Sequence, residues 1–286
     1  MTVPDHAHHS VVDVWLVPTP LASYEALKER YGHWLSEDER ERLRLQRTPK
    51  GAYAFLLTRI ALRAVLSLRV PAVEPGEWKF ERTARGRPAA INITDAPDFN
   101  LSHADDALVI ATAADGKLGV DIESLAREVT DAERLARRYF HPDEVAALLS
   151  LPVEQQLPRF LTLWTLKEAC VKATGQGLAN ALQEFYFRLE APPELQCPRF
   201  DCDGYDARER RWWRAWSGVL TPSQGARFRV SLAWRLGSED LAGAASLRFR
   251  QLRFGSTADE LDQQLISEPL SMRWQADWLY TPEPTR

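Results

Sequence analysis

The 286-residue sequence has little cysteine: Cys170, Cys197 and Cys202 are the three that it contains. A count this low and odd argues against a disulfide framework and fits a reducing compartment, so we expect a cytoplasmic protein. Cys197 and Cys202 have no second pair of cysteines nearby, which argues against a zinc site. The N-terminus also lacks the basic and apolar regions of a secretory signal peptide.

Three further absences each exclude a class of protein. No run of about eighteen apolar residues occurs, so we expect no membrane span. The net charge of −4 gives no support to a general nucleic-acid binder. No P-loop or dinucleotide-binding glycine pattern appears, which weakens kinase and dehydrogenase interpretations. With 45% apolar and 27% charged residues, the chain is predicted to be globular, with one large domain or two modest ones.

The chain contains a degenerate internal repeat at an offset of 105 residues. Ser36–Glu39 has the pattern of a capping box, and His141–Glu144 places a proline in the first turn of a second helix. Phe55-Leu56 matches Phe160-Leu161 at the same offset. The repeat predicts two similar halves, each with strands and a long helix, and a cleft between such halves is a natural ligand site.

The predicted fold is therefore α+β, a pseudo-dimer of two α+β subdomains with the active site in the cleft between them. Alternating β-branched residues predict strands, and apolar residues at helical spacing predict helices. We expect subdomains over residues 1–117 and 118–237, with the metal site in the second, and a C-terminal extension of unknown role over 238–286. Strands are expected at 11–17, 108–113, 118–123 and 228–234, helices at 58–68 and 160–173, and a loop at 192–206.

Two carboxylates share one face of the expected strand Gly119-Val120-Asp121-Ile122-Glu123. Val120 and Ile122 would point into the core, and Asp121 and Glu123 would point together the other way. Two carboxylates side by side repel each other unless a cation lies between them, and hard oxygen ligands without His or Cys suit Mg²⁺. The alternative is an acidic, solvent-facing strand, which is the commoner situation for such a pair taken alone.

The helix that contains Trp164-Thr165-Leu166-Lys167-Glu168 and continues to Lys172 offers a third carboxylate. Trp164, Glu168 and Lys172 are spaced by four and lie on one side, with Lys167 beside them. Such an arrangement is often a plain surface ion pair. If this face meets Asp121 and Glu123, the acidic and basic groups together could hold Mg²⁺ and neutralise a pyrophosphate.

A third element is Phe99-Asn100-Leu101-Ser102-His103, preceded by three arginines around a glycine at Arg82-Thr83-Ala84-Arg85-Gly86-Arg87-Pro88. His103 alone is more commonly a structural histidine, and the arginines could simply decorate a loop. Because arginine forks match phosphate geometry, a phosphate-binding role is favoured once an anion site is suspected.

Together, in this order and spacing, these pieces resemble the surfactin-type 4′-phosphopantetheinyl transferases. The resemblance runs from about Ser36 to about Leu178, and the pieces GRP, FNLSH, GVDIE and WTLKEACVKATGQGL stand in the family order. The last two are highly specific as a pair. The resemblance implies a pseudo-dimeric α+β fold that binds coenzyme A in the interdomain cleft.

The resemblance also implies roles for individual residues. Asp121, Glu123 and Glu168 would be the magnesium ligands, and Glu168 and Lys172 the catalytic pair. Ser102 and His103 would bind the nucleotide phosphates. The coenzyme A contacts would be Lys50, Arg82, Arg85, Gly86, Arg87, Pro88, Ser102, His103, Lys167 and Lys172.

The first helix departs from the family pattern. Glu39 and Arg42 stand where the surfactin-type enzyme has lysines, which puts the 3′-phosphate contacts of that helix in doubt. Arg47 is the alternative to Lys50 for a further phosphate contact.

The implied reaction transfers the 4′-phosphopantetheine arm of coenzyme A, the co-substrate, to a serine of an apo acyl or peptidyl carrier protein. Glu168 would take the serine proton directly or through a water molecule, and 3′,5′-ADP would leave. We expect a monomer with no nucleic-acid or membrane partner. The carrier protein and the pathway stay open between fatty-acid, polyketide and nonribosomal-peptide synthesis.

Two other interpretations remain at this point. The chain could be a binding module for coenzyme A or a carrier protein that has lost catalysis, although its intact carboxylates and lysines argue against this. It could also be a Mg²⁺-dependent nucleotide hydrolase, which would release products from coenzyme A without any carrier protein.

Overall fold

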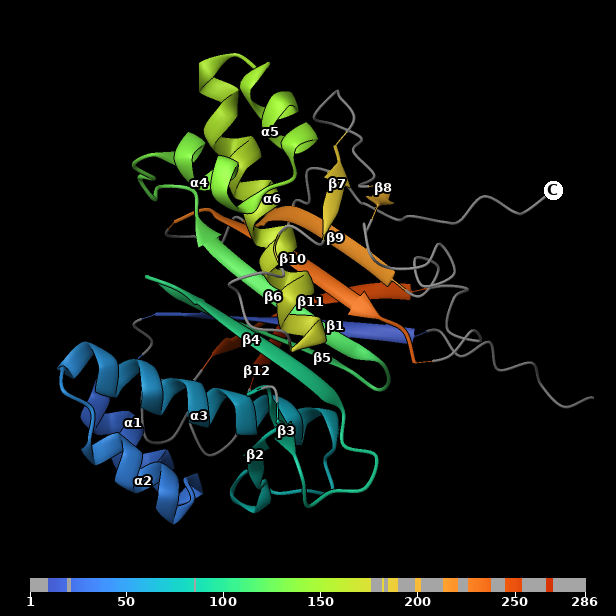
Figure 1. Cartoon of the computed structure of the whole chain (residues 1–286). Coiled ribbons are helices and arrows are strands. Elements are labelled where there is room, and N and C mark those ends of the chain that lie inside the picture. The colour runs from blue at the N-terminus through green and yellow to red at the C-terminus, as the bar shows by residue number, and fades with distance from the viewer. Residues whose placement is uncertain are drawn as a thin grey trace, which may run out of the picture.

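The computed structural model shows a mixed α+β protein of several helices and sheets (Figure 1). The residues that it describes are 10–19, 22–84, 86–175, 182, 185–189, 199–201, 213–220, 226–237, 245–253 and 266–269.

The first part of the chain begins with a strand and a group of helices, which a β-hairpin and two longer strands follow. In order these are β1 (Ser10–Pro18), α1 (Tyr24–Tyr31), α2 (Glu37–Arg44), α3 (Pro49–Arg69), β2 (Phe80–Arg82), β3 (Pro88–Ala90), β4 (Asp98–Ala104) and β5 (Ala107–Ala113). Short 3₁₀ helices lie at Gly32–Trp34 and Pro75–Glu77.

The second part repeats this order. It contains β6 (Lys117–Ser124), α4 (Ala132–Tyr139), α5 (Pro142–Leu149), α6 (Val153–Thr174), β7 (Tyr186–Arg188), β8 (Arg199–Asp201), β9 (Trp213–Leu220) and β10 (Phe228–Arg235). Two further strands, β11 (Ala245–Arg253) and β12 (Ile266–Pro269), follow it.

The two main sheets also repeat one pairing scheme. In the first, β1 pairs antiparallel with β5 and β5 pairs antiparallel with β4. In the second, β6 pairs antiparallel with β10 and β10 pairs antiparallel with β9. The first sheet is larger because β11 adds parallel to β1, and β12 adds antiparallel to β11 at the edge of the sheet.

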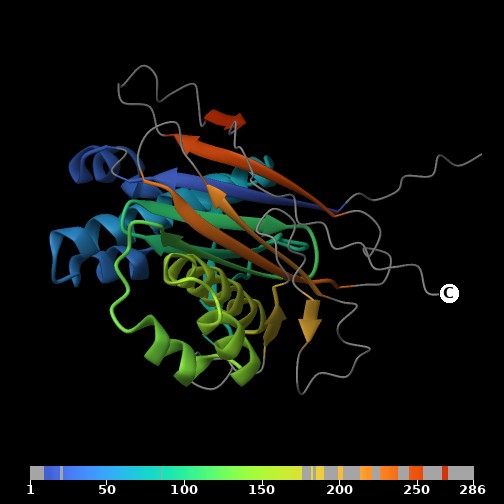
Figure 2. The same cartoon turned by 90° about the horizontal axis from the view of Figure 1, so that it is seen from above.

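Three hydrophobic cores follow from this layering. Val14 of β1 and Val120 of β6 belong to a core between the two sheets. A second core lies between α3 and the five-stranded sheet, and a third lies between α6 and the three-stranded sheet. Figures 1 and 2 show α3 and α6 lying against different parts of the strand layers. Strand β5 is covered on both faces, so all of its residues are buried and all but one are apolar.

Capping boxes start α2, as the sequence predicts, and also α5, where the sequence predicted a helix start with a proline in its first turn. The side chain of Ser36 accepts a hydrogen bond from the backbone N–H of Glu39 at the start of α2, and the Glu39 carboxylate accepts one from the backbone N–H of Ser36. His141 and Glu144 make the corresponding contacts at the start of α5, with Pro142 at its first position. These reciprocal contacts satisfy backbone N–H groups that the first turn leaves without partners.

Helix α3 is long and apolar enough, by length and composition, to cross a membrane. Most of its apolar window is buried, and Leu56, Ile60 and Leu66 lie in the core against the five-stranded sheet. This burial is what a core helix of a globular domain requires.

The strands expected at 11–17, 108–113, 118–123 and 228–234 lie within β1, β5, β6 and β10, and the expected helices lie within α3 and α6. The loop expected at 192–206 is wrong at 199–201, which form β8 and pair with β7. Residues 192–198 and 202–206 lie outside the described part of the chain. Proline, cysteine and aspartate mark turns in composition, but a three-residue strand between them is too short to show a period.

Candidate active site

The side chains of Asp121 and Glu123 lie on the same face of β6, as predicted, because Val120 and Ile122 fill the core between the sheets. Asp121 is 5% exposed, and its Oδ2 atom has no hydrogen-bond partner among the described residues. Glu168 comes from α6, which packs along β6, and it is also buried. Three carboxylates from two elements therefore lie in one region.

Protein cations already contact two of these carboxylates. The Lys172 ammonium lies 2.7 Å from Asp121 Oδ1 and donates to Ser102 Oγ at 2.8 Å. Ser102 in turn donates to Asp121 Oδ1 at 2.8 Å. Arg127, in the segment after β6, forms an ion pair with Glu123. The site is thus a network of acidic and basic groups and not a bare acidic patch.

Burial and like charge act together on Glu168. Loss of solvent, followed by the nearby charges of Asp121 and Glu123, raises the pKa of Glu168 to about 7, although Lys172 opposes the shift. Burial also raises the pKa of Glu123, against the opposing effect of Arg127. A positive charge placed among these groups would lower the pKa of both carboxyl groups.

The donor set suits a hard divalent cation such as Mg²⁺, since it consists of carboxylate oxygens and includes the buried, unpartnered Oδ2 of Asp121. Within the described ranges, no three His, Cys, Asp or Glu side chains lie close enough to form a ready-made metal centre. Glu123 would first have to exchange its contact with Arg127. The residues therefore suit the ion chemically, but Asp121, Glu123 and Glu168 do not already lie in the geometry of a metal centre.

A cavity of about 1430 Å³ opens beside this network. It is larger than the roughly 300–1,000 Å³ of most small-molecule sites, so it has room for an extended ligand. One wall comes from the second part of the chain and contributes Glu123, Arg127, Glu168 and Lys172. The opposite wall comes from α2, α3, β2–β3, β4 and the turn after β4. It contributes Arg42, Lys50, Tyr53, Thr58, Arg59, Arg82, Gly86, Pro88 and His103, together with the carboxylates of Asp38, Glu39, Glu81 and Asp105.

His103 lines the cavity beside α3. The hydroxyl of Thr58 donates its one proton to the Ala54 carbonyl at 2.6 Å, so we assign Nε2–H of His103 as the donor to Thr58 Oγ1 at 2.7 Å. Burial, with Lys172 and Arg59 nearby, lowers the pKa of His103. The imidazole is therefore neutral near pH 7 until an anion arrives, and its Nδ1 is then ready to take a proton.

The remaining predicted phosphate contacts on this wall are exposed or form a turn. Lys50 pairs with Asp105 at 2.9 Å, and both side chains are exposed. Gly86 has a φ of 81°, which favours glycine, and its carbonyl accepts a hydrogen bond from Arg82 at 2.8 Å. Pro88 begins β3. Arg85 lies outside the described residues.

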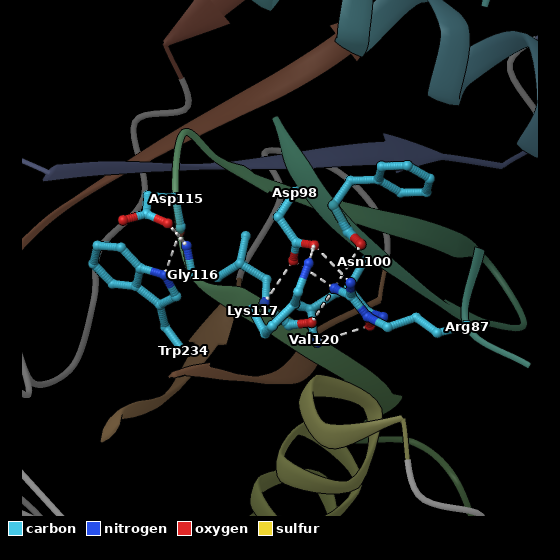
Figure 3. A network of polar contacts seen from close by, with 10 residues as sticks. Arg87, Asp98, Asn100, Asp115, Gly116, Lys117, Val120 and Trp234 are labelled. Carbon is cyan, nitrogen blue, oxygen red and sulfur yellow. Dashed lines mark hydrogen bonds and ion pairs between the residues drawn. The ribbon is translucent and has the colours of Figure 1, made fainter. Parts of the chain in front are cut away.

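Arg87 and Lys167 are placed differently from the expectation that both contact coenzyme A. The Arg87 guanidinium is buried and binds Asp98 and two backbone carbonyls (Figure 3). Lys167 is fully buried, lies 2.7 Å from Glu144, and donates to the carbonyls of Leu182 and Phe185. On a helix, Lys167 points about 100° away from Glu168, and that angle directs it into the core behind α6.

The sequence interpretation missed Thr58, Arg59 and Arg127, which line the cavity. Thr58 and Arg59 belong to α3, where the predicted helix began at Thr58 and was treated as a structural element. Arg127 stands four residues after Glu123, and this spacing was the available signal for an ion pair.

Comparison with known proteins identifies the family. A sequence model described as the 4′-phosphopantetheinyl transferase superfamily matches residues 117–221. The 4′-phosphopantetheinyl transferase HetI of Nostoc sp. is 36% identical over 189 residues, which cover 65% of this chain and 78% of that relative. The chain belongs to the 4′-phosphopantetheinyl transferase superfamily.

Other transferases of this kind are similar over comparable lengths. Sfp of Bacillus subtilis is 29% identical over 170 residues, covering 59% of this chain and 72% of that protein. The phosphopantetheinyl transferase of Thraustochytrium sp. is 29% identical over 211 residues, covering 68% of this chain and 71% of that protein. The family predicted from the motifs is confirmed, and the region matched by the superfamily model includes β6 and α6, which carry the three carboxylates.

Proposed function

We propose that this chain transfers the 4′-phosphopantetheine arm of coenzyme A to a serine of an apo acyl or peptidyl carrier protein, with Mg²⁺ as the metal. The observation that carries this proposal is a single cavity lined by the carboxylate of Glu168 beside Lys172 and by further cations, such as Arg82, from the first part of the chain. A diphosphate with a nucleotide at one end needs both, since the metal and the cations divide its charge between them.

The wall from the second part of the chain would hold the metal. Asp121, Glu123 and Glu168 are the proposed ligands, and Asp121 would offer its unpartnered Oδ2. When bound, Mg²⁺ would supply neutralisation of the diphosphate charge. Lys172 is held at this place by Ser102 and Asp121, so its ammonium is available to a phosphate oxygen without a large movement.

The opposite wall would hold the nucleotide end of coenzyme A. His103, with its neutral imidazole, can take up a proton and become a cation when a phosphate approaches. Arg82 and Lys50 are near the opening, and the turn at Gly86-Arg87-Pro88 lines the cavity beside them. We propose nucleotide contacts for His103, Arg82, Lys50, Gly86 and Pro88.

The reaction forms one phosphorus–oxygen bond and breaks another. The serine oxygen of the carrier attacks the β-phosphorus of coenzyme A, the bond to the bridging oxygen breaks, and 3′,5′-ADP leaves. We propose that Glu168 accepts the serine proton. Its burial beside Asp121 and Lys172 would exclude competing water from the reaction.

We also propose that residues 1–117 and 118–237 form a pseudo-dimer with this site between the two halves. The repeated element order supports this. So does a pair of matching contacts: Asp121 of β6 binds Lys172 of α6, and Asp13 of β1 binds Arg69 of α3 at 3.0 Å. We further propose a cytoplasmic monomer; the few cysteines, of which Cys170 is a buried free thiol, support the cytoplasmic location.

Incubation with coenzyme A, Mg²⁺ and a panel of apo carrier proteins tests the proposal. Intact-mass measurement should show a gain of about 340 Da on at least one carrier, the mass of the transferred arm. EDTA and the Asp121→Ala variant should each abolish the gain. Release of products from coenzyme A without a carrier would instead indicate a hydrolase, and binding without any mass change would indicate a binding module.

A further inference from the structure

We propose that Arg87 and Asp98 form a clasp that sets the register between the two sheets, which makes Arg87 a positioning residue and not a phosphate ligand. The clasp consists of these two side chains and the backbone of Leu118 that both of them contact. The role in positioning rests on the proposed function, because the groups that it positions are those of the proposed active site.

The two sheets meet along β4 and β6, and side chains make the connection there. Three alternate residues of β4 lie on one face and reach β6. Asp98 Oδ2 accepts from the Leu118 N–H at 2.8 Å, and Asn100 Oδ1 accepts from the Val120 N–H at 3.0 Å. Ser102 Oγ donates to Asp121 Oδ1 at 2.8 Å. These contacts occupy the places that backbone partners would fill in a continuous sheet.

Arg87 joins three elements at the end of this row (Figure 3). Its two terminal nitrogens each lie 2.6 Å from one oxygen of Asp98, in the bidentate geometry of a strong ion pair. One of them also donates to the carbonyls of Phe99 in β4 and Leu118 in β6, at 2.9 and 2.7 Å. Both side chains are about nine-tenths buried. Removing Asp98 would leave the Arg87 charge without a carboxylate partner, whereas Asp98 would keep Lys117, at 3.1 Å, if Arg87 were removed.

Two of the three parts of the clasp lie on the same strands as Asp121 and Ser102 of the proposed active site. Leu118 stands three residues before Asp121 on β6, and Asp98 stands four residues before Ser102 on β4. A strand advances about 3.3 Å per residue, so a change of register at the clasp would move Asp121 past Ser102 and Lys172. Glu123 is further along the same strand and would move with them.

The rival interpretation is that Arg87 binds a phosphate of coenzyme A, since the residue lines the cavity. A phosphate would have to displace a bidentate carboxylate and two carbonyls from the same guanidinium. Asp98, in contrast, is not among the residues that line the cavity. Substitution of Asp98 therefore separates the two interpretations, because it affects the clasp and leaves Arg87 free to bind a phosphate.

The experiment compares Arg87→Lys, Asp98→Asn and the double variant in the full chain. We expect each single change to lower kcat at least about fivefold while the coenzyme A Kd changes less than about threefold, and the double variant to be no more than about twofold worse than the poorer single. Amide hydrogen exchange should accelerate at residues 98–103 and 117–122 in all three. Glu37→Gln, which breaks an exposed Glu–Arg pair on α2, is the control. It should leave kcat, the coenzyme A Kd and the exchange rates unchanged.

Three results would overturn the proposal. The first is a coenzyme A Kd raised about tenfold or more by Arg87→Lys and left unchanged by Asp98→Asn, as a phosphate ligand requires. The second is additive losses of kcat in the double variant, and the third is a lower melting temperature with unchanged kcat and unchanged exchange at 117–122.

If Asp98→Asn does not fold, Asp98→Glu takes its place. If the wild type transfers to no carrier, the exchange and Kd measurements still decide the clasp, and the failure belongs to the proposed function.

Discussion

At the scale of single residues, Glu168 shows how burial and charge make one group sensitive to pH. Its pKa is raised to about 7, chiefly by burial and then by Asp121 and Glu123. The folded protein therefore holds the proton of Glu168 more tightly than the unfolded chain does. The stability that this provides is fully present below the ordinary pKa of about 4.5 and is lost as the pH rises through 7.

Glu168→Gln removes this titration, since the amide stays neutral. Without metal, we expect it to raise the free energy of unfolding at pH 8 by roughly 1–3 kcal/mol over the wild type, with the gain disappearing near pH 4.5. Urea unfolding at both pH values, in EDTA, measures the difference. Glu133→Gln, which alters an exposed carboxylate paired with Arg137, is the control. A gain of equal size at both pH values would contradict the role given to burial and to the neighbouring carboxylates.

Single residues also show how far the sequence could be interpreted. Asp121 and Glu123 could be placed on one face because a strand alternates, and no other information was needed. Arg87 and Lys167 stand in equally distinctive motifs, but their partners are Asp98, eleven residues away, and Glu144, twenty-three residues away. A motif shows which residue types occur together. It does not show which of them the tertiary fold will bury.

At the scale of elements, the contact between β6 and α6 depends on Gly119. A Cβ atom at this position would lie 1.8 Å from the carbonyl oxygen of Ala169 and 2.5 Å from the backbone nitrogen of Ala173. Both are helix backbone atoms that cannot turn aside. Gly119 thus lets the strand that carries Asp121 approach the helix that carries Glu168 and Lys172.

Gly119→Ala should force α6 away from β6. We expect a loss of about 3 kcal/mol or more in the free energy of unfolding, since overpacking against backbone cannot be relieved by a change of rotamer. Transfer activity should fall at the same time, because Glu168 and Lys172 would move away from Asp121. Chemical denaturation and the carrier mass assay measure the two effects. Ala113→Gly, at a buried position in β5, is a comparison in which a methyl group is removed, and full stability of Gly119→Ala would disprove the close contact.

The buried pair of Lys167 and Glu144 connects α6 to α5 and to the segment after α6. Glu144 also accepts from the backbone of Phe187 at 2.8 Å and of His141 at 2.8 Å, so one carboxylate holds a helix cap, a strand and a lysine. Burial nevertheless raises the pKa of Glu144 above its usual value. The matching carboxylate of α2, Glu39, pairs with Arg63 of α3 at 2.7 Å.

Lys167→Met should therefore act on stability more than on ligand binding. It leaves a buried carboxylate without its cation, and we expect a loss of about 3–5 kcal/mol in the free energy of unfolding. The double variant Lys167→Met, Glu144→Gln should recover part of this loss because the charge is then removed as well. Thermal denaturation and coenzyme A titration of the folded variants measure the effects. A large rise in the coenzyme A Kd with unchanged stability would instead restore the predicted phosphate contact.

Elements with strong local signals were predictable, and those defined by distant partners were not. The starts of α2 and α5 follow from side chains within three positions of each other, and such patterns are legible in a sequence. The strand β11 carries no signal of that kind for its place. It adds to the sheet because β1, more than two hundred residues earlier, offers a free edge.

At the scale of the whole molecule, β11 and β12 extend the sheet that contains β1. Arg248 of β11 lies 2.7 Å from Asp13 of β1, and Arg250 lies 3.6 Å from it. Leu252 is fully buried in the core under α3. Within the extension expected at 238–286, for which the sequence suggested no role, β11 and β12 therefore belong to the sheet that contains β1.

A chain truncated after Gly237 should lose stability and solubility. The edge of β1 would be exposed, and Asp13 would keep Arg69 as a partner but lose Arg248 and Arg250. We expect a melting temperature at least several degrees lower, because a loss of about 1 kcal/mol already shifts it by roughly 2–4 °C in a domain of this size. Differential scanning calorimetry measures this, with a chain ending at Pro269, which keeps β11 and β12, for comparison. An unchanged melting temperature in the chain truncated after Gly237 would contradict the role given to β11.

The row of side chains between β4 and β6 has a consequence for how the molecule responds to substitution. Each sheet closes its own backbone hydrogen bonds, whereas Asp98, Asn100 and Ser102 connect β4 to β6 through their side chains. A single substitution in this row can therefore loosen the two walls of the cavity against each other while both sheets keep their strand pairing.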